Sequence, residues 1–380
     1  MGEEREEGKE RENHLQEAFL KSCRGRKSQA FSLLDLEKFS LPRLKEAGVE
    51  EAELDLRLLM QEAFSLDTKD YLLGKRESLP LVYRKREAYS SSCQITPEES
   101  ADSSFCSSET LNSDLSRFFS FLEQRLQRIP LSQILGRQEF FGLSFLVNEN
   151  VLSPRQDTEC IVERILLEEE NTSEKPLSVL DLCTGSGCIG LTLAKHLPCH
   201  KLILLDKSGK ALEVAKENYR RLFFNQEDTF KSSGRDDFTE QNKGASVYFL
   251  ESDLFDSLPS FMKERDISGF DILVSNPPYI RSSVIPGLDE EVALHEPRIA
   301  LDGGTDGLDF YRRIAKEGKG FLLPGGRVYL EIGYDQGESV KNIFQKEGYR
   351  EVEVFQDYEG RDRGLYAALQ LDTNKTIHYY

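Results

Sequence analysis

The chain has 380 residues, of which 38% are hydrophobic and 31% charged, and these values are typical of two globular domains with a well-solvated surface. No run of about 18 apolar residues occurs, and the charged N-terminus lacks the apolar segment of a secretory signal, so we expect a cytoplasmic protein with no membrane partner. The formal net charge of −18 argues against binding to nucleic acid, and the dispersed cysteines and histidines predict neither disulfides nor a metal site.

The first half of the chain predicts a small helical domain. Residues 1–30 form a charged arm, expected to be a solvated helix or disordered. Apolar residues then recur at helical spacing over 31–74 and again over 115–128, up to Pro130. Between them, a Ser-rich stretch at about 81–114 is expected to be a flexible insertion. Residues 31–128 are therefore predicted to be one helical domain.

Residues 129–160 predict a β-hairpin linker, with strands within 138–152 and Gly142 near the turn. From Leu177 onward, short apolar runs alternate with helical stretches, which predicts a parallel, doubly wound α/β sheet over residues 161–371. A polar insertion at about 226–244 interrupts this domain, and residues 372–380 form a tail. The predicted strands are 177–182, 201–205, 247–250, 270–275, 327–332, 351–355 and 364–371.

A glycine-rich loop follows the first of these strands. Such a loop brings backbone N–H groups close to a ligand, and Asp206, at the end of the second strand, is placed to accept both hydroxyls of a ribose. The spacing of the glycines in this loop also fits a nicotinamide dehydrogenase, or a turn that binds no ligand. Asp181 favours S-adenosylmethionine, because a carboxylate attracts an ammonium group and repels a pyrophosphate. The candidate cofactor residues here are Asp181, Cys183, Thr184, Gly185, Ser186, Gly187 and Asp206.

Two further loops complete the predicted site. After the third strand, Asp253 can accept the adenine amino group while Leu254 covers the ring, although Asp253 also fits a helix N-cap. After the fourth strand, Asn276-Pro277-Pro278-Tyr279 lies where open α/β sheets bind ligands. The Asn276 side-chain oxygen and the Pro277 carbonyl can orient a planar NH2 group for attack on a methyl group, and Tyr279 can stack on it. A Pro-Pro turn that merely ends a strand is the alternative.

Together these motifs resemble the PrmC/HemK family of protein-(glutamine-N5) methyltransferases. The resemblance extends to residues 44–59, 130–140, 151–159, 296–308 and 331–333. It implies a seven-stranded, Rossmann-like α/β methyltransferase sheet with an N-terminal helical substrate-recognition domain. It also implies that Asn276 to Tyr279 bind the substrate glutamine, that Asn276 and Leu254 also contact S-adenosylmethionine, and that the partner is a class 1 peptide-chain release factor. We expect a monomer.

The chain departs from the family pattern at Cys183, where Gly is usual, at Gln156, where Pro is usual, and at Leu254, where some members carry an aromatic residue. Other functions stay open. Adenine-N6 and cytosine-N4 methyltransferases use the same kind of loop but also need a duplex-binding surface. A lysine methyltransferase and a non-catalytic S-adenosylmethionine-binding protein are further alternatives.

Overall fold

The computed structural model describes residues 14–23, 31–79, 108–169, 176–224 and 246–369. It divides into two compact units, Met1–Leu135 and Gly136–Tyr380. The start of the predicted arm, most of the Ser-rich insertion, the polar insertion and the tail lie outside the described residues. Within the described ranges, no helix is both long and apolar enough to cross a membrane.

The first unit is helical. Its helices are α2 (Leu33–Glu46), α3 (Ala52–Ala63), α4 (Thr68–Gly74), α6 (Ser108–Leu126) and α7 (Leu131–Leu135). A capping box begins α2, because the Ser32 hydroxyl accepts from the Asp35 N–H while the Asp35 carboxylate accepts from the Ser32 N–H at 3.0 Å. The core of this unit is formed by apolar side chains of α2, α3 and α6.

Two parts of this unit differ from the sequence-based expectation. Residues 14–22 are helical, and Phe19 is only 1% exposed, with its ring centre 5.2 Å from that of Phe31. This part of the arm is therefore not fully solvated, because Leu15, Phe19 and Cys23 form a short stripe at four-residue spacing. Helix α6 begins at Ser108, inside the predicted flexible stretch, and Leu111 and Leu115 begin the apolar face that packs in the core.

The second unit begins with the expected hairpin, β1 (Arg137–Phe140) and β2 (Leu143–Leu146), with Gly142 in the turn at φ +71°. A seven-stranded sheet follows in the order β5-β4-β3-β6-β7-β9-β8. Its strands are β3 (Leu177–Leu182), β4 (Cys199–Asp206), β5 (Ser246–Glu251), β6 (Phe270–Ser275), β7 (Leu322–Glu331), β8 (Glu351–Gln356) and β9 (Asp362–Ala368). The predicted α/β class and the seven strands are confirmed.

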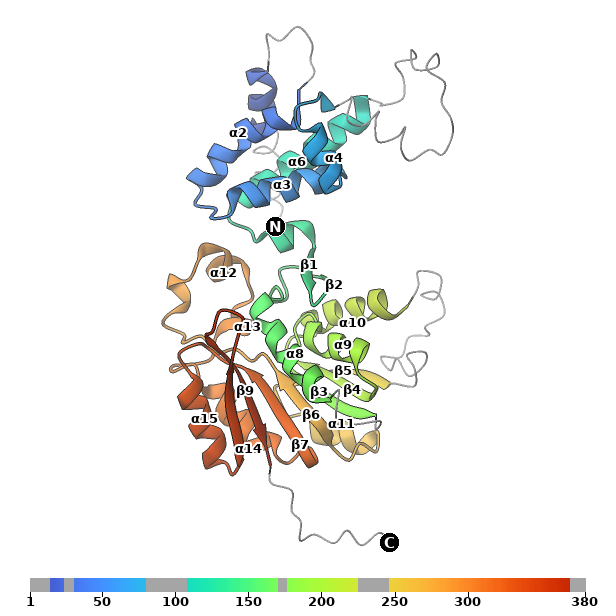
Figure 1. Cartoon of the computed structure of the whole chain (residues 1–380), viewed down its shortest axis with the longest axis vertical. Helices are drawn as coiled ribbons and strands as arrows, with labels where there is room; N and C mark the ends of the chain where they lie inside the picture. The colour runs from blue at the N-terminus through green and yellow to red at the C-terminus, as the bar shows by residue number, and fades with distance from the viewer. Residues whose placement is uncertain (1–13, 24–30, 80–107, 170–175, 225–245, 370–380) are drawn as a thin grey trace. The chain divides into compact units, whose positions relative to one another are not determined.

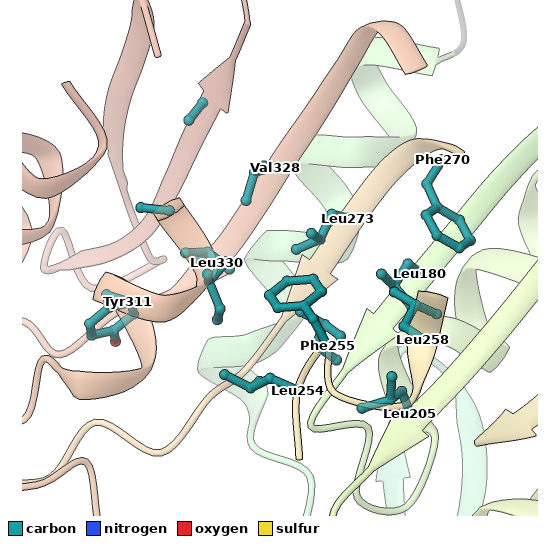
Figure 2. Close-up of a cluster of buried hydrophobic side chains, with 14 of the residues drawn as sticks. Leu180, Leu205, Leu254, Phe255, Leu258, Phe270, Leu273, Tyr311, Val328 and Leu330 are labelled. Atoms are coloured by element: carbon teal, nitrogen blue, oxygen red, sulfur yellow. The ribbon is translucent and has the colours of Figure 1, made fainter. Parts of the chain in front are cut away.

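Helices cover both faces of this sheet (Figure 1). One face packs against α8 (Gln156–Glu169), α9 (Cys188–His196) and α10 (Gly209–Phe223). The other packs against α11 (Leu258–Glu264), α14 (Asp309–Gly318) and α15 (Gly337–Lys346). Figure 2 shows part of this second core, where Leu180, Leu273 and Leu330 of the central strands lie near Phe255 and Tyr311.

The sheet is mixed, although the alternating pattern predicts a parallel one. Strand β9 runs antiparallel to both β7 and β8. The chain between β8 and β9 is a tight turn, in which the Asp357 N–H donates to the Arg361 carbonyl at 2.9 Å. A connection of that length cannot make the crossover that a parallel pair needs.

The strand order determines where on the sheet the candidate site lies. The chain leaves β3 toward β4 and β5 on one side and later passes through β6 and β7 on the other, so the order reverses between β3 and β6. Ligands of open α/β sheets bind outside the carboxyl ends of the strands at this switch point. The glycine-rich loop follows β3 and Asn276 follows β6 at that edge.

Candidate active site

An open cleft of about 820 Å³ lies at the switch point within the second unit. The predicted residues that line it are Cys183, Thr184, Gly185, Ser186, Asp206, Asn276 and Pro278. Lining residues to which the sequence assigned no role include Asn150, Val151, Thr158, Lys207, Ile299 and Phe310.

The glycine-rich loop has the backbone conformation that its glycines predict. Gly185 and Gly187 have φ values of +55° and +81°, and Gly187 is the N-cap of α9. Gly190 permits close packing, since a Cβ there would lie 2.5 Å from Leu204 Cδ2 and 2.8 Å from Asp181 Oδ2. The loop is thus shaped by the positive φ of its glycines and by tight contact beneath it.

Asp181 lies beneath this loop and not on the cleft surface. It is 1% exposed, and its Oδ2 accepts from the Thr184 hydroxyl at 2.6 Å and from the Gly190 N–H at 3.0 Å. Its Oδ1 has no hydrogen-bond partner in the described part of the chain. Burial raises the pKa of Asp181 to about 7, against the opposing effect of these two donors. In this position Asp181 can act on a cationic group in the cleft only through the loop that covers it.

Asp206 connects the second strand to the loop. One carboxylate oxygen accepts from the Gly185 N–H at 2.9 Å and the other from the Ser208 N–H at 2.8 Å. Burial raises the pKa of this carboxyl, and the backbone donors oppose the rise. Asp206 therefore stands at the cleft wall in one fixed orientation, with lone pairs left to accept from ligand hydroxyls.

Cys183, the departure from the family pattern, has φ +56° in the left-handed region. Glycine reaches this region at no steric cost, whereas a residue with a Cβ is strained there. The family's glycine at this position thus has a physical reason in this structure. The thiol is not poised to react, because burial raises its pKa.

The structure does not place Asp253 or Leu254 on the cleft surface. The Asp253 carboxylate binds Lys207 Nζ at 2.6 Å and Arg313 Nη1 at 2.7 Å, and the N-cap of the following helix is Ser257. Leu254 is 2% exposed and belongs to the core beneath the cleft. Of the two, Asp253 is connected to the cleft through Lys207, which lines it.

The Asn276–Tyr279 loop is held from several directions. Ser275, at the end of β6, donates its hydroxyl to the Leu182 carbonyl at 2.6 Å and so joins the β6 loop to the glycine-rich loop. Asn276 Nδ2 donates to Thr158 Oγ1 at 3.4 Å. The Tyr279 hydroxyl donates to Glu331 Oε1 at 3.0 Å. Pro277 and Pro278 are buried, and Pro278 lines the cleft.

The far end of this loop is also fixed. Gln336 Nε2 donates to the Tyr279 carbonyl at 3.0 Å, and a Cβ on Gly303 would lie 2.7 Å from Tyr279 Cα. Burial raises the pKa of the Tyr279 hydroxyl far above its usual value, and the nearby Glu331 charge adds to the rise, so this hydroxyl stays protonated. The loop is thus held at both of its ends by contacts within the protein.

Arg155 and Glu296 form an ion pair at the rim, where Arg155 Nη2 donates to both Glu296 oxygens at 2.9 Å. Glu296 is buried, which raises its pKa, while Arg155 lines the cleft and opposes that rise. The pair joins the segment before α8 to the segment after α12 (Glu290–His295). Because each charge satisfies the other, the two residues shape the cleft wall as a structural pair.

Sequence reasoning assigned no role to Thr158 or Glu331, which the structure brings to the loop from α8 and β7. Thr158 lies more than a hundred residues before Asn276, and Glu331 lies on another strand. Spacing in the sequence therefore gives no sign that they contact the loop. Their only signal is that both fall within segments that resemble the family, 151–159 and 331–333.

Comparison with known proteins identifies relatives along most of the chain. Residues 161–244 match the family model described as methyltransferase small domain. A release factor glutamine methyltransferase from Caulobacter vibrioides is 35% identical over 321 residues, 84% of this chain and 91% of that protein. One from Clostridium acetobutylicum is 39% identical over 259 residues, 68% of this chain and 82% of that protein.

Among solved structures, the release factor-specific protein-(glutamine-N5) methyltransferase of Alicyclobacillus acidocaldarius is similar to this chain. It is 24% identical, and the match covers 57% of this chain and 94% of that one with a TM-score of 0.32.

Proposed function

The chain belongs to the family of release factor glutamine methyltransferases, and we propose that its cleft binds S-adenosylmethionine and methylates the side-chain amide nitrogen of the glutamine in the Gly-Gly-Gln motif of class 1 release factors. The family membership makes it an enzyme and release factors its substrates. The assignment of the cofactor, of the Gly-Gly-Gln glutamine and of each residue's role is our proposal. Action in the cytoplasm, as a monomer, is part of that proposal.

The cleft residues fit S-adenosylmethionine. Asp206 offers carboxylate oxygens to ribose hydroxyls, and the loop from Cys183 to Gly187 offers backbone at close range. Asp181, with its buried Oδ1 lacking a partner, supplies the negative charge for an ammonium group. When bound, this cofactor supplies an electrophilic methyl group on a positively charged sulfur. Asp253 and Leu254 remain candidates for the adenine side; neither lines the cleft, and Asp253 is connected to it through Lys207.

Orientation of the substrate amide is the chemical task of the Asn276 loop. The lone pair of an amide nitrogen is delocalised into the carbonyl, so the group attacks poorly unless it is held in one geometry. The Asn276 side-chain oxygen and the Pro277 carbonyl can each accept one N–H bond of the glutamine, and Tyr279 can stack on the amide plane. Since Pro277 and Pro278 have no N–H and fixed φ, the loop offers acceptors without competing donors. Catalysis then rests on positioning and electrostatics.

The observation that carries this proposal is that Asn276 and Pro278 line the same cleft as the glycine-rich loop and Asp206. Methylation of a nucleobase by the same loop is the competing function, and the net charge of −18 gives no support to a duplex partner.

Transfer of labelled methyl groups tests the proposal. Purified chain and labelled S-adenosylmethionine are incubated with a class 1 release factor, with its Gln-to-Ala variant in the Gly-Gly-Gln motif, and with duplex DNA. We expect label on the first alone. Label on DNA would support the nucleobase alternative, and cofactor binding without transfer would support a binding protein. Asn276→Ala should keep cofactor affinity within about threefold and lose nearly all transfer, since Asn276 is one of several residues expected to contact the cofactor but is the side chain that orients the amide.

A further inference from the structure

We infer that Thr158 and Glu331 are positioning residues that determine which way the Asn276 amide faces. The inference rests on the proposed function, in which the Asn276 oxygen must accept from the substrate amide. An asparagine amide has nearly equal shape in its two orientations, one of which presents NH2 where the other presents oxygen. A donor there would repel the glutamine NH2 group, so the orientation decides whether the loop can work.

The contacts give the hydrogen bonds a direction. Glu331 is 2% exposed, and its two oxygens receive the hydroxyls of Thr158 and Tyr279. Burial raises the pKa of Glu331, whereas the two hydroxyls and the charge of Arg363 favour the ionised form. In this geometry Thr158 gives its single hydroxyl proton to Glu331 Oε2, as the Tyr279 hydroxyl does to Oε1.

Thr158 can then only accept from Asn276. Nδ2 of Asn276 lies 3.4 Å from Thr158 Oγ1 and donates to it. The amide oxygen of Asn276 consequently faces away from Thr158 and has no partner among the described residues. Both Thr158 and Asn276 line the cleft, whereas Glu331 is buried behind them. The buried carboxylate thus sets the polarity of the acceptor that the substrate meets.

Nearby groups do not supply this polarity by another route. Arg363 donates to Asp157 at 3.0 Å and to Asp357 at 3.2 Å, and it acts on Glu331 through its charge. Gln336 is engaged with the Tyr279 carbonyl and the Gly333 N–H. Within the described part of the chain, Thr158 is the one side chain that forms a hydrogen bond with the Asn276 amide.

Three variants test the inference by turnover at saturating cofactor and release factor. Thr158→Val keeps the shape and removes the hydroxyl, Thr158→Ser keeps the hydroxyl, and Thr192→Val is the control. Thr192 is also a buried threonine, but its hydroxyl donates to the Cys188 carbonyl at 2.6 Å within α9. We expect Thr158→Val to lower kcat on the order of tenfold, the effect of one lost hydrogen bond. Thr158→Ser and Thr192→Val should stay within about threefold, and cofactor Kd should stay within about threefold in all.

Glu331→Gln separately tests the direction of the hydrogen bond between Thr158 and Asn276. The NH2 group of the introduced glutamine can donate to Thr158 and turn the Thr158 proton toward Asn276. Asparagine-selective ¹⁵N labelling, with the Asn276 signal identified from Asn276→Asp, reports the amide without any activity. We expect the Asn276 NH2 signals to move in Thr158→Val and Glu331→Gln and to stay in Thr158→Ser.

The outcomes separate the two claims. A wild-type chain that fails to label the release factor refutes the proposed function, whatever the NMR signals show. With a labelling wild type, a Thr158→Val variant within threefold of it, or a Thr158→Ser variant as impaired as Thr158→Val, overturns the inference. If Thr158→Val does not fold, unmoved Asn276 signals in Glu331→Gln overturn it.

Discussion

The strained conformation of Cys183 makes a prediction about its two simplest replacements. At φ +56°, an alanine retains the strain of a Cβ in the left-handed region, roughly 1–2 kcal/mol, and a glycine does not. Glycine loses about 0.4–1 kcal/mol of this advantage, because its unfolded chain has more freedom. We therefore expect Cys183→Gly to be more stable than Cys183→Ala by about 0.5–1 kcal/mol. For a unit of this size that difference amounts to roughly 2 °C in Tm.

The matched control is Cys160, a buried cysteine inside helix α8 whose backbone is helical. Glycine costs about 0.8–1 kcal/mol relative to alanine in a helix, so Cys160→Ala should be more stable than Cys160→Gly. Equilibrium urea unfolding of the four variants, followed by circular dichroism, measures both differences. The order of the Ala and Gly variants should reverse between the two positions. An alanine variant at Cys183 as stable as the glycine variant would refute the reasoning.

Three more predictions concern the cleft. Gly190→Ala should lower the Tm, because the added methyl would lie 2.5 Å from a Leu204 methyl and overpacking costs about 1–3 kcal/mol. Thermal unfolding measures this change, and an unchanged Tm would contradict the tight packing at Gly190. Burial raises the pKa of Asp181 to about 7, so its contribution to the stability of the free chain falls as pH rises from about 4 to 7. Near pH 7 the folded carboxyl ionises, which strengthens its attraction for a cation. Calorimetry from pH 5.5 to 7.5 should show cofactor affinity rising on the order of tenfold, and a wild-type profile as flat as that of Asp181→Asn would refute the role. Asp253→Asn should change cofactor affinity by less than about threefold, since this carboxylate is engaged by Lys207; a large loss would restore direct contact with adenine.

Much of the second unit could be predicted from the sequence because its signals are local. The strand runs, the glycine-rich turn and the proline-stiffened loop each depend on a few consecutive residues, and the switch point follows from strand order. Cys183 illustrates the limit. Its departure from the family pattern is visible in the sequence, but the positive φ that explains it is visible only in the structure.

Contacts between distant segments could not be predicted in this way. The partner of Asn276 comes from α8 and the partner of Tyr279 from β7, and neither contact leaves a periodic trace. Asp253 shows the same limit: its loop position suggests a ligand contact, whereas the cations that bind its carboxylate in the structure come from other elements. In the first unit, the many charges around Phe19 hide a stripe of only three apolar residues.

The pairing of two neighbouring strands has a consequence for how this enzyme can vary. Ser275 of β6 pairs with Leu330 of β7, so the next residues, Asn276 and Glu331, lie side by side just past the last pair of these two strands, while Glu331 still pairs with Gly364 of β9. The backbone hydrogen bonds between the two strands set the distance between these residues, and the long connection between the strands does not affect it. Insertions in that connection can therefore reshape the mouth of the cleft and leave Asn276 and Glu331 in their relative positions. One residue added within either strand would displace the pair by about 3.3 Å and send one side chain to the opposite face.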